Sequence, residues 1–252
     1  MADSDVNPLG PSALRASEPP TVLGRPGGRG FFIVGTDTGV GKTLVAAGLL
    51  HALAQRHARV VGMKPVAAGA VQVGGVWASE DALALRAAST IAVPPELDNP
   101  VLLPEPLSPH LAAARAGRTI DVDALVTCYD ALAAQADAVV VEGAGGFLVP
   151  LGDEATGADL ALRLRLPLVL VVGLRLGCLN HALLTAEAIA TRGLRLAGWV
   201  ANRIDPQMAA VDDNIATLVR RLPAPLWAEV PHGCTDARHI PFNHRFQNDV
   251  LA

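Results

Sequence analysis

The chain has 252 residues, 51% of them hydrophobic and 17% charged, so it can form one large domain with a substantial buried core. A formal net charge of −4 leaves no broad basic face, which argues against a primary role in binding nucleic acid or an anionic membrane. The apolar runs have the length of strands, far short of a bilayer span. The three scattered cysteines suggest neither a disulfide framework nor a zinc site, so a reducing cytoplasm fits best.

Residues 1–29 predict a flexible leader. They are rich in proline, glycine and serine, show no sustained hydrophobic period, and lack the apolar core of a secretory signal. Residues 30–252 are expected to form a single domain, because neither an internal repeat nor a second domain is visible in them.

A glycine-rich loop follows the first predicted strand, the apolar run of residues 31–34. The stretch GTDTGVGKT at residues 35–43 matches the phosphate-loop pattern GxxxxGK[ST] at every fixed position, and a helical pattern begins at Lys42. The glycines let backbone N–H groups approach a phosphate closely, and the helix start adds a positive dipole. Lys42 is therefore expected to reach the β- and γ-phosphates of a nucleotide, and Thr43 the magnesium ion.

A second strand is predicted over residues 59–66, with Lys64 near its carboxyl end, where open α/β sheets collect ligands. Residues 67–79 are small and glycine-rich and predict a loop, and a helix with Asp81 in its first turn follows. By position alone, Lys64 could be an ordinary solvated lysine and Asp81 an ordinary first-turn acid. Residues 94–109 are interpreted as a proline-punctuated connection, followed by helices at about 109–116 and 121–135.

The third strand, residues 138–141, ends in Glu142 and a run of small residues. A carboxylate that closes an apolar strand is typical of the magnesium-side group of phosphate-loop proteins. Further strands are predicted at residues 168–173, 196–201 and 226–230. Apolar strands that alternate with helices predict an α/β fold, here the three-layer P-loop NTPase fold with a mostly parallel sheet covered by helices on both faces.

Five motifs together resemble the dethiobiotin synthetase family over about residues 31–231. They are GTDTGVGKT at 35–43, KPVAAG at 64–69, VEGAGG at 141–146, LGCLNH at 176–181 and GWVAN at 198–202. The resemblance implies an ATP- and Mg²⁺-dependent ligase of biotin synthesis that converts 7,8-diaminononanoate and CO2 to dethiobiotin, ADP and phosphate. One amine would capture CO2 as a carbamate, ATP would phosphorylate it, and the second amine would close the ureido ring.

The resemblance also implies roles for individual residues. Lys64 and Lys42 would be catalytic, and Thr43, Asp81 and Glu142 would hold Mg²⁺. Nucleotide contacts would come from Gly39, Val40, Gly41, Lys42, Thr43, Leu44, Asp81, Glu142, Gly143, Ala144, Gly145, Asn202, Arg203, Pro231, His232 and Gly233. Substrate contacts would come from Lys64, Ala68, Gly177, Cys178, Leu179 and Asn180.

Residues 177–180 would be offered across the interface of an obligate homodimer to the substrate's carboxylate, with Cys178 in a packing role. The sequence departs from the family pattern at several positions. Gly39 stands where many relatives have an acid, Ala68 where a hydroxyl is common, and Arg203 where an acid is frequent. Arg175 replaces a frequent lysine, and residues 234–252 match poorly. His239 and His244 could form a metal pair, but their loop-like and polar setting favours surface histidines.

Two alternatives are less well supported. A phosphate-loop amide ligase such as those acting on cobyrinic acid usually carries a glutaminase domain, for which 252 residues leave no room. A partition or septum-site ATPase carries a signature lysine near the start of the loop, where this chain has Asp37. No basic or amphipathic membrane tail follows either.

Overall fold

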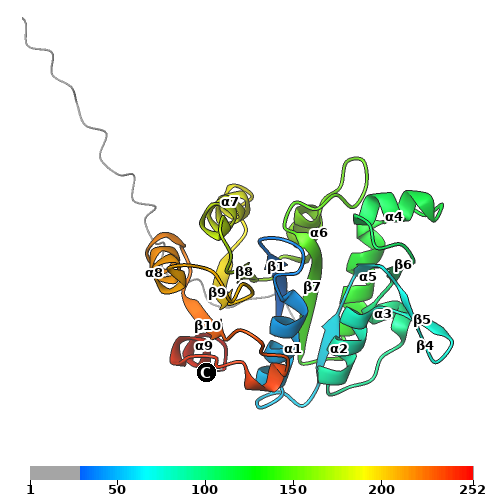
Figure 1. The fold of residues 1–252 in the computed structure, drawn as a ribbon. Coiled ribbons are helices and arrows are strands. Elements are labelled where there is room, and N and C mark those ends of the chain that lie inside the picture. Colours follow the sequence, from blue (N-terminus) through cyan, green and yellow to red (C-terminus); the bar gives the residue numbers. More distant parts are fainter. Residues whose placement is uncertain (1–28, 252) are drawn as a thin grey trace, which may run out of the picture.

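Residues 29–251 are described by the computed structural model, and six of their apolar segments form one parallel sheet. The strand order is β10-β9-β8-β1-β7-β2, and every pairing is parallel (Figure 1). This confirms the predicted fold class. The strands are β1 (Arg29–Gly35), β2 (Val60–Met63), β7 (Ala138–Gly146), β8 (Leu168–Gly173), β9 (Leu196–Asn202) and β10 (Leu226–Val230). The interpretation of the leader lies outside the described residues.

Helices cover both faces of the sheet because each strand is apolar on both sides (Figure 1). In β1, Phe31 and Ile33 pack into the core on one face, and Phe32 and Val34 pack into the core on the other. One face is covered by α1 (Lys42–Leu53), α2 (Glu80–Ala88), the 3-10 turn η1 (Ala237–His239) and α9 (His244–Val250). The other is covered by α4 (Pro109–Arg115), α5 (Val122–Ala133), α6 (Gly157–Leu164), α7 (Cys178–Thr191) and α8 (Val211–Arg221).

The central strand β1 places the glycine-rich loop in the middle of the sheet's carboxyl edge. β1 pairs with β7 on one side and β8 on the other, so the loops that follow these three strands are neighbours. Such a point, where the strand order changes direction, is where open α/β sheets bind ligands. The fold therefore brings the glycine-rich loop, Glu142 and residues 174–177 to one edge.

Two small sheets lie beside the main one and correct the sequence prediction between residues 59 and 109. β2 ends at Met63 because Pro65 has no N–H to donate to a sheet. The chain then forms β3 (Val66–Ala68), which pairs with β6 (Val101–Leu103). A hairpin replaces the predicted loop: β4 (Val71–Val73) and β5 (Val76–Ala78), joined by Gly74 and Gly75. Alternating residues around a Gly-Gly pair are a hairpin signal that the loop prediction overlooked. A short helix, α3 (Pro95–Asp98), also lies in the predicted connection.

The C-terminal segment that departs from the family pattern is folded onto the sheet. Phe246 of α9 is fully buried and meets Trp227 of β10 edge-on, with ring centroids 5.3 Å apart. His239 is exposed, as predicted for a surface histidine, and its Nδ1 lies 3.5 Å from Oδ2 of Asp236. No helix in residues 29–251 is long and apolar enough to cross a membrane.

Candidate active site

The glycine-rich loop, residues 36–41, is held in a shape that needs glycine at two positions. Gly39 and Gly41 have φ angles of 73° and 91°, in the left-handed region that side chains disfavour. A Cβ on Gly41 would also lie 2.3 Å from Nδ2 of Asn202. The loop is therefore packed directly against the end of β9.

Both lysines of the sequence, Lys42 and Lys64, lie in this site and are buried. Lys42 begins α1, and its Nζ donates to the backbone oxygen of Asp37 at 3.0 Å. Burial, aided by the charge of Lys64, lowers the pKa of Lys42 to about 8. A phosphate group bound in the loop would stabilise the ammonium form.

Titration of Lys42 gives a direct prediction. With lysine labelled at Cε, two side-chain NMR signals are expected, and that of Lys42 should titrate near pH 8 in the nucleotide-free protein. A nucleoside triphosphate should raise this pKa, so binding takes up protons and affinity falls as the pH rises above 8. Affinity that stays constant from pH 7 to 9 would contradict this prediction. Lys64 is the internal reference, because its two carboxylate neighbours raise its pKa despite burial.

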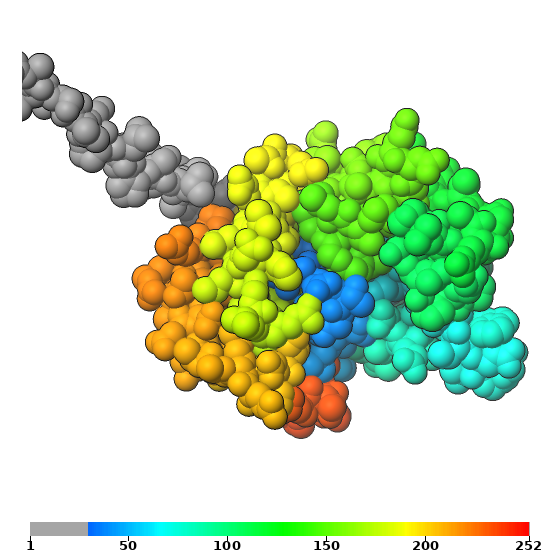
Figure 2. Space-filling view, turned by 45° about the horizontal axis from the view of Figure 1, so that its top comes forward, coloured from blue at the N-terminus to red at the C-terminus, as the bar shows by residue number. Residues whose placement is uncertain are grey.

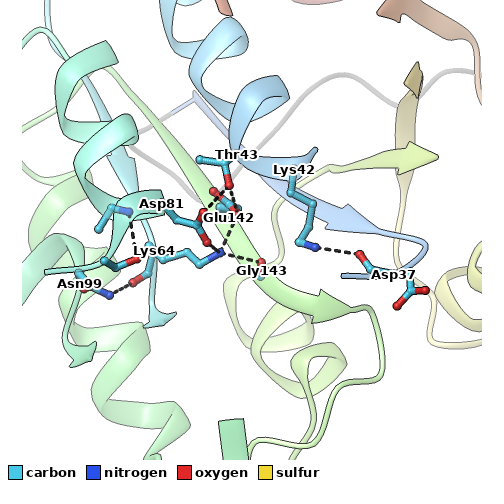
Figure 3. A network of polar contacts seen from close by, with 10 residues as sticks. Asp37, Lys42, Thr43, Lys64, Asp81, Asn99, Glu142 and Gly143 are labelled. Atoms are coloured by element: carbon cyan, nitrogen blue, oxygen red, sulfur yellow. Dashed lines mark hydrogen bonds and ion pairs between the residues drawn. The ribbon is translucent and has the colours of Figure 1, made fainter. Parts of the chain in front are cut away.

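A cluster of charges forms beside the loop from four separate elements (Figure 3). The Thr43 hydroxyl on α1 lies 2.8 Å from Oδ1 of Asp81 on α2 and 2.9 Å from Oε1 of Glu142 on β7. Nζ of Lys64, just after β2, lies 2.7 Å from Oδ2 of Asp81 and 2.6 Å from Oε1 of Glu142. The structure thus brings together the four side chains predicted to handle metal and phosphate.

The electrostatics of this cluster keep Lys64 charged. Glu142 and Lys64 are only 1% and 4% exposed, so neither charge is well solvated. Burial alone would raise the pKa of Asp81, but the ammonium of Lys64 outweighs it and lowers that pKa. An ammonium between two carboxylates therefore balances part of their charge.

The donor set of the cluster fits a magnesium ion. Oε2 of Glu142 is buried and has no hydrogen-bond partner among residues 29–251, which is costly for a carboxylate oxygen. Mg²⁺ binds one or two carboxylates together with phosphate oxygens and water, and Asp81, Glu142 and the Thr43 hydroxyl offer that chemistry.

Lys64 is positioned by two buried residues that the sequence analysis did not identify, Asp98 and Asn99. The Lys64 backbone N–H donates to the Asp98 oxygen at 2.7 Å, and the Asn99 amide donates to the Lys64 oxygen at 2.7 Å. The Asp98 carboxylate is in turn bound by Arg86. The signal in the sequence was the polar Asp-Asn-Pro turn within an otherwise apolar, proline-rich connection.

Asn202 ends β9 and reaches the glycine-rich loop. Its Nδ2 donates to the backbone oxygen of Val40 at 2.9 Å. Because only the amide nitrogen can donate to a carbonyl, this bond occupies Nδ2 and leaves Oδ1 as the acceptor of the side chain. Asn202 is 7% exposed, so its orientation is held by packing as well.

The predicted nucleotide contacts that follow Asn202 in the sequence are Arg203, Pro231, His232 and Gly233. His232 is exposed, and its Nδ1 lies 3.0 Å from the Arg203 backbone oxygen. The guanidinium of Arg203 is engaged by Asp212 at 2.5 Å and Glu229 at 3.2 Å. In this structure the guanidinium of Arg203 is therefore paired with carboxylates of α8 and β10.

Helix α7 starts beside the loop with free donors. Gly177 caps it with a φ of 96°, and no acceptor among the described residues takes the N–H groups of Leu179 and Asn180. Cys178 is 2% exposed, in agreement with its predicted packing role. Ala68 is half-buried at the end of β3. The structure does not bring Ala68 and residues 177–180 into one contact network.

Comparison with known proteins assigns the family. A family model described as an AAA domain matches residues 29–234. ATP-dependent dethiobiotin synthetase BioD of Aromatoleum aromaticum is 56% identical over 206 residues, 81% of this chain and 91% of that protein.

Two solved structures are more distant. The cell division protein FtsY of Thermotoga maritima is 17% identical with a TM-score of 0.47, over 92% of this chain and 71% of that one. The septum site-determining protein MinD of Pyrococcus horikoshii, complexed with Mg-ADP, is 21% identical with a TM-score of 0.46, over 81% of both chains. The family resemblance seen in the five motifs is confirmed by the family model and by BioD: the chain belongs to the AAA-domain family and to the ATP-dependent dethiobiotin synthetases.

Proposed function

We propose that the site joins CO2 to one amine of 7,8-diaminononanoate and closes the ureido ring of dethiobiotin at the expense of ATP. The observation that carries this proposal is the placement of the Lys64 ammonium. It lies beside the phosphate-loop helix, within 2.7 Å of both carboxylates that would hold Mg²⁺. A fixed positive charge at that point suits a reaction in which an anionic carbamate attacks a phosphoryl group.

The nucleotide half of the site would work by positioning. Backbone N–H groups of residues 39–44 and the Lys42 ammonium would hold the β- and γ-phosphates. To reach these phosphates, the Lys42 ammonium must break its hydrogen bond to the backbone oxygen of Asp37. Thr43, Asp81 and Glu142 would hold Mg²⁺, which supplies charge neutralisation on the phosphates.

Lys64 would bind the carbamate. The first amine adds to CO2 and loses a proton, and a carbamate oxygen then displaces ADP from the γ-phosphorus. The second amine attacks the carbonyl carbon and phosphate leaves, so no covalent enzyme intermediate is required. The chain's contribution would be alignment and charge stabilisation, from Lys64 and the backbone of residues 143–145.

The substrate's carboxylate would bind at the start of α7, across a homodimer interface. Support comes from the unsatisfied N–H groups there and from two exposed apolar side chains, Leu176 at 95% and Leu184 at 56%. Exposed leucines beside a helix N-terminus suit a surface that a second copy covers. We place this homodimer in the cytoplasm, because its three cysteines are free and the cytoplasm keeps thiols reduced.

The proposed function is tested by incorporation of labelled bicarbonate into an acid-stable product. The complete mixture of protein, Mg-ATP and 7,8-diaminononanoate should retain label with matching ADP release, and mixtures lacking any one component should not. Tight Mg-ATP binding without incorporation would instead indicate a switch ATPase or another phosphate-loop ligase.

Asn202 predicts a preference for adenine. With Nδ2 bound to Val40, its Oδ1 could accept from the 6-amino group of adenine, whereas the O6 acceptor of guanine would face it with like polarity. ATP should therefore be preferred over GTP by about 10- to 100-fold in kcat/KM. Asn202→Ala should lose most of that preference. Asn214→Ala on α8, whose amide donates to the oxygen of the N-cap residue Ala210, is the control and should keep it. An unchanged preference in Asn202→Ala would remove Asn202 from base recognition.

A further inference from the structure

The loop after β1 and the loop after β8 are joined by one ion pair. β1 and β8 are neighbouring parallel strands, so residues 36–41 and 174–177 leave the sheet side by side. The guanidinium of Arg175 pairs there with the carboxylate of Asp37. In the space-filling view the blue surface after β1 adjoins the yellow-green surface after β8 (Figure 2).

Asp37 is the residue through which this pair acts on the glycine-rich loop. Its Oδ1 accepts the Thr38 backbone N–H at 2.7 Å, while its backbone oxygen accepts Nζ of Lys42 at 3.0 Å. A shift of Asp37 would therefore move the loop backbone that faces the phosphates.

Arg175 is equally tied to α7. Its backbone oxygen accepts the Cys178 N–H at 3.0 Å, which sets the first turn of the helix. The preceding Leu174 donates to the Asn202 oxygen at 2.8 Å, and Asn202 donates back to Val40 in the glycine-rich loop. The two loops are therefore linked twice: directly by the Arg175–Asp37 pair, and indirectly through Asn202 at the end of β9.

We propose that Arg175 is a positioning residue that couples nucleotide binding to binding of the substrate's carboxylate at α7. The proposal rests on the proposed function, which puts that carboxylate at the start of α7. A triphosphate brings negative charge next to the Asp37 carboxylate, and Arg175 offsets the repulsion, so the occupied loop favours the paired state. The paired state orients α7, so each ligand should tighten the other. If α7 serves the partner's site, the link runs between the two sites of the dimer.

The pair is weak enough to act as an adjustable link. The side chains of Arg175 and Asp37 are 44% and 43% exposed, so solvent and salt screen their attraction. A pair of this kind changes an equilibrium by about fivefold at most. The expected coupling is therefore modest and sensitive to ionic strength.

The test is the affinity of a non-hydrolysable ATP analogue with Mg²⁺, measured by calorimetry with and without saturating 7,8-diaminononanoate. The wild-type protein should bind the analogue about threefold to fivefold more tightly with the substrate present, and less so at high salt. Arg175→Ala should reduce this ratio to about one, and Arg175→Lys should restore part of it. By linkage, the analogue must tighten the substrate by the same ratio.

Two further variants separate coupling from a general structural effect. Arg59→Ala breaks another exposed Arg–Asp pair, with Asp137, and should keep the wild-type ratio. Adding Asp37→Asn to Arg175→Ala should lower the ratio no further, because both changes break one contact. The coupling is overturned if this ratio is one in the wild-type protein. It is also overturned if Arg175→Ala keeps the ratio of the wild type. Neither result affects the bicarbonate assay, whose failure would separately overturn the proposed function.

Discussion

Replacement of Lys64 by alanine is expected to lower turnover by about 10²- to 10³-fold, the cost of removing one preorganised charge from a transition state. ATP affinity should change little, because Lys42 and the loop backbone bind the phosphates. The measurement is steady-state turnover together with equilibrium ATP binding. Turnover close to that of the wild type would remove Lys64 from the mechanism.

The same variant should be less stable without metal. Lys64 is 4% exposed and pairs with Asp81 and Glu142, so its removal leaves two carboxylates facing each other. Loss of one partner from a buried ion pair costs about 3 kcal/mol in the free energy of unfolding. Mg²⁺ with ATP should restore much of this stability, since the ion supplies the missing charge. Lys64→Arg keeps the charge but not the shape, and should be more stable than Lys64→Ala without regaining full turnover.

Glu142→Gln should weaken metal binding in the nucleotide complex by about tenfold and lower turnover by at least as much. Glutamine keeps the shape of the side chain but removes the charge and one of two hard oxygen donors. Glu142 is the candidate of choice because its Oε2 is buried and unpartnered among the described residues. Free Mn²⁺ measured by electron paramagnetic resonance, at a fixed concentration of a non-hydrolysable ATP analogue, reports the affinity.

Glu105→Gln is the matched control for this experiment. Glu105 also pairs with a basic side chain, Arg115 at 2.7 Å, but on the surface and outside the charge cluster. Its replacement should leave Mn²⁺ affinity unchanged. If Glu142→Gln binds Mn²⁺ as tightly as this control, Glu142 is not a metal ligand.

Local patterns predicted the main strands well. The predicted strand at 168–173 coincides with β8, because a strand buried on both faces must be a continuous apolar run. The predicted strand at 226–230 coincides with the edge strand β10, although its Glu229 is exposed. The helix predicted with Asp81 in its first turn is α2, and the Ser79 side chain caps it by accepting a backbone N–H of that turn. The stretch between residues 59 and 109 was less well predicted. The hairpin strands β4 and β5 in this stretch are largely exposed, so turn geometry decides them rather than hydrophobic period.

The sequence by itself determined the phosphate loop, the parallel α/β sheet and the family, because these depend on residue types at fixed local spacing. Tertiary structure alone decided which of these residues meet. Thr43, Asp81 and Glu142 lie 38 and 61 positions apart in succession, and the packing of the helices on the sheet brings the Thr43 hydroxyl within 3 Å of both carboxylates. The support of Lys64 by residues 98–99 and the Arg175–Asp37 pair were likewise invisible in the sequence. Contacts between loops depend on how neighbouring strands align, and no local pattern encodes that alignment.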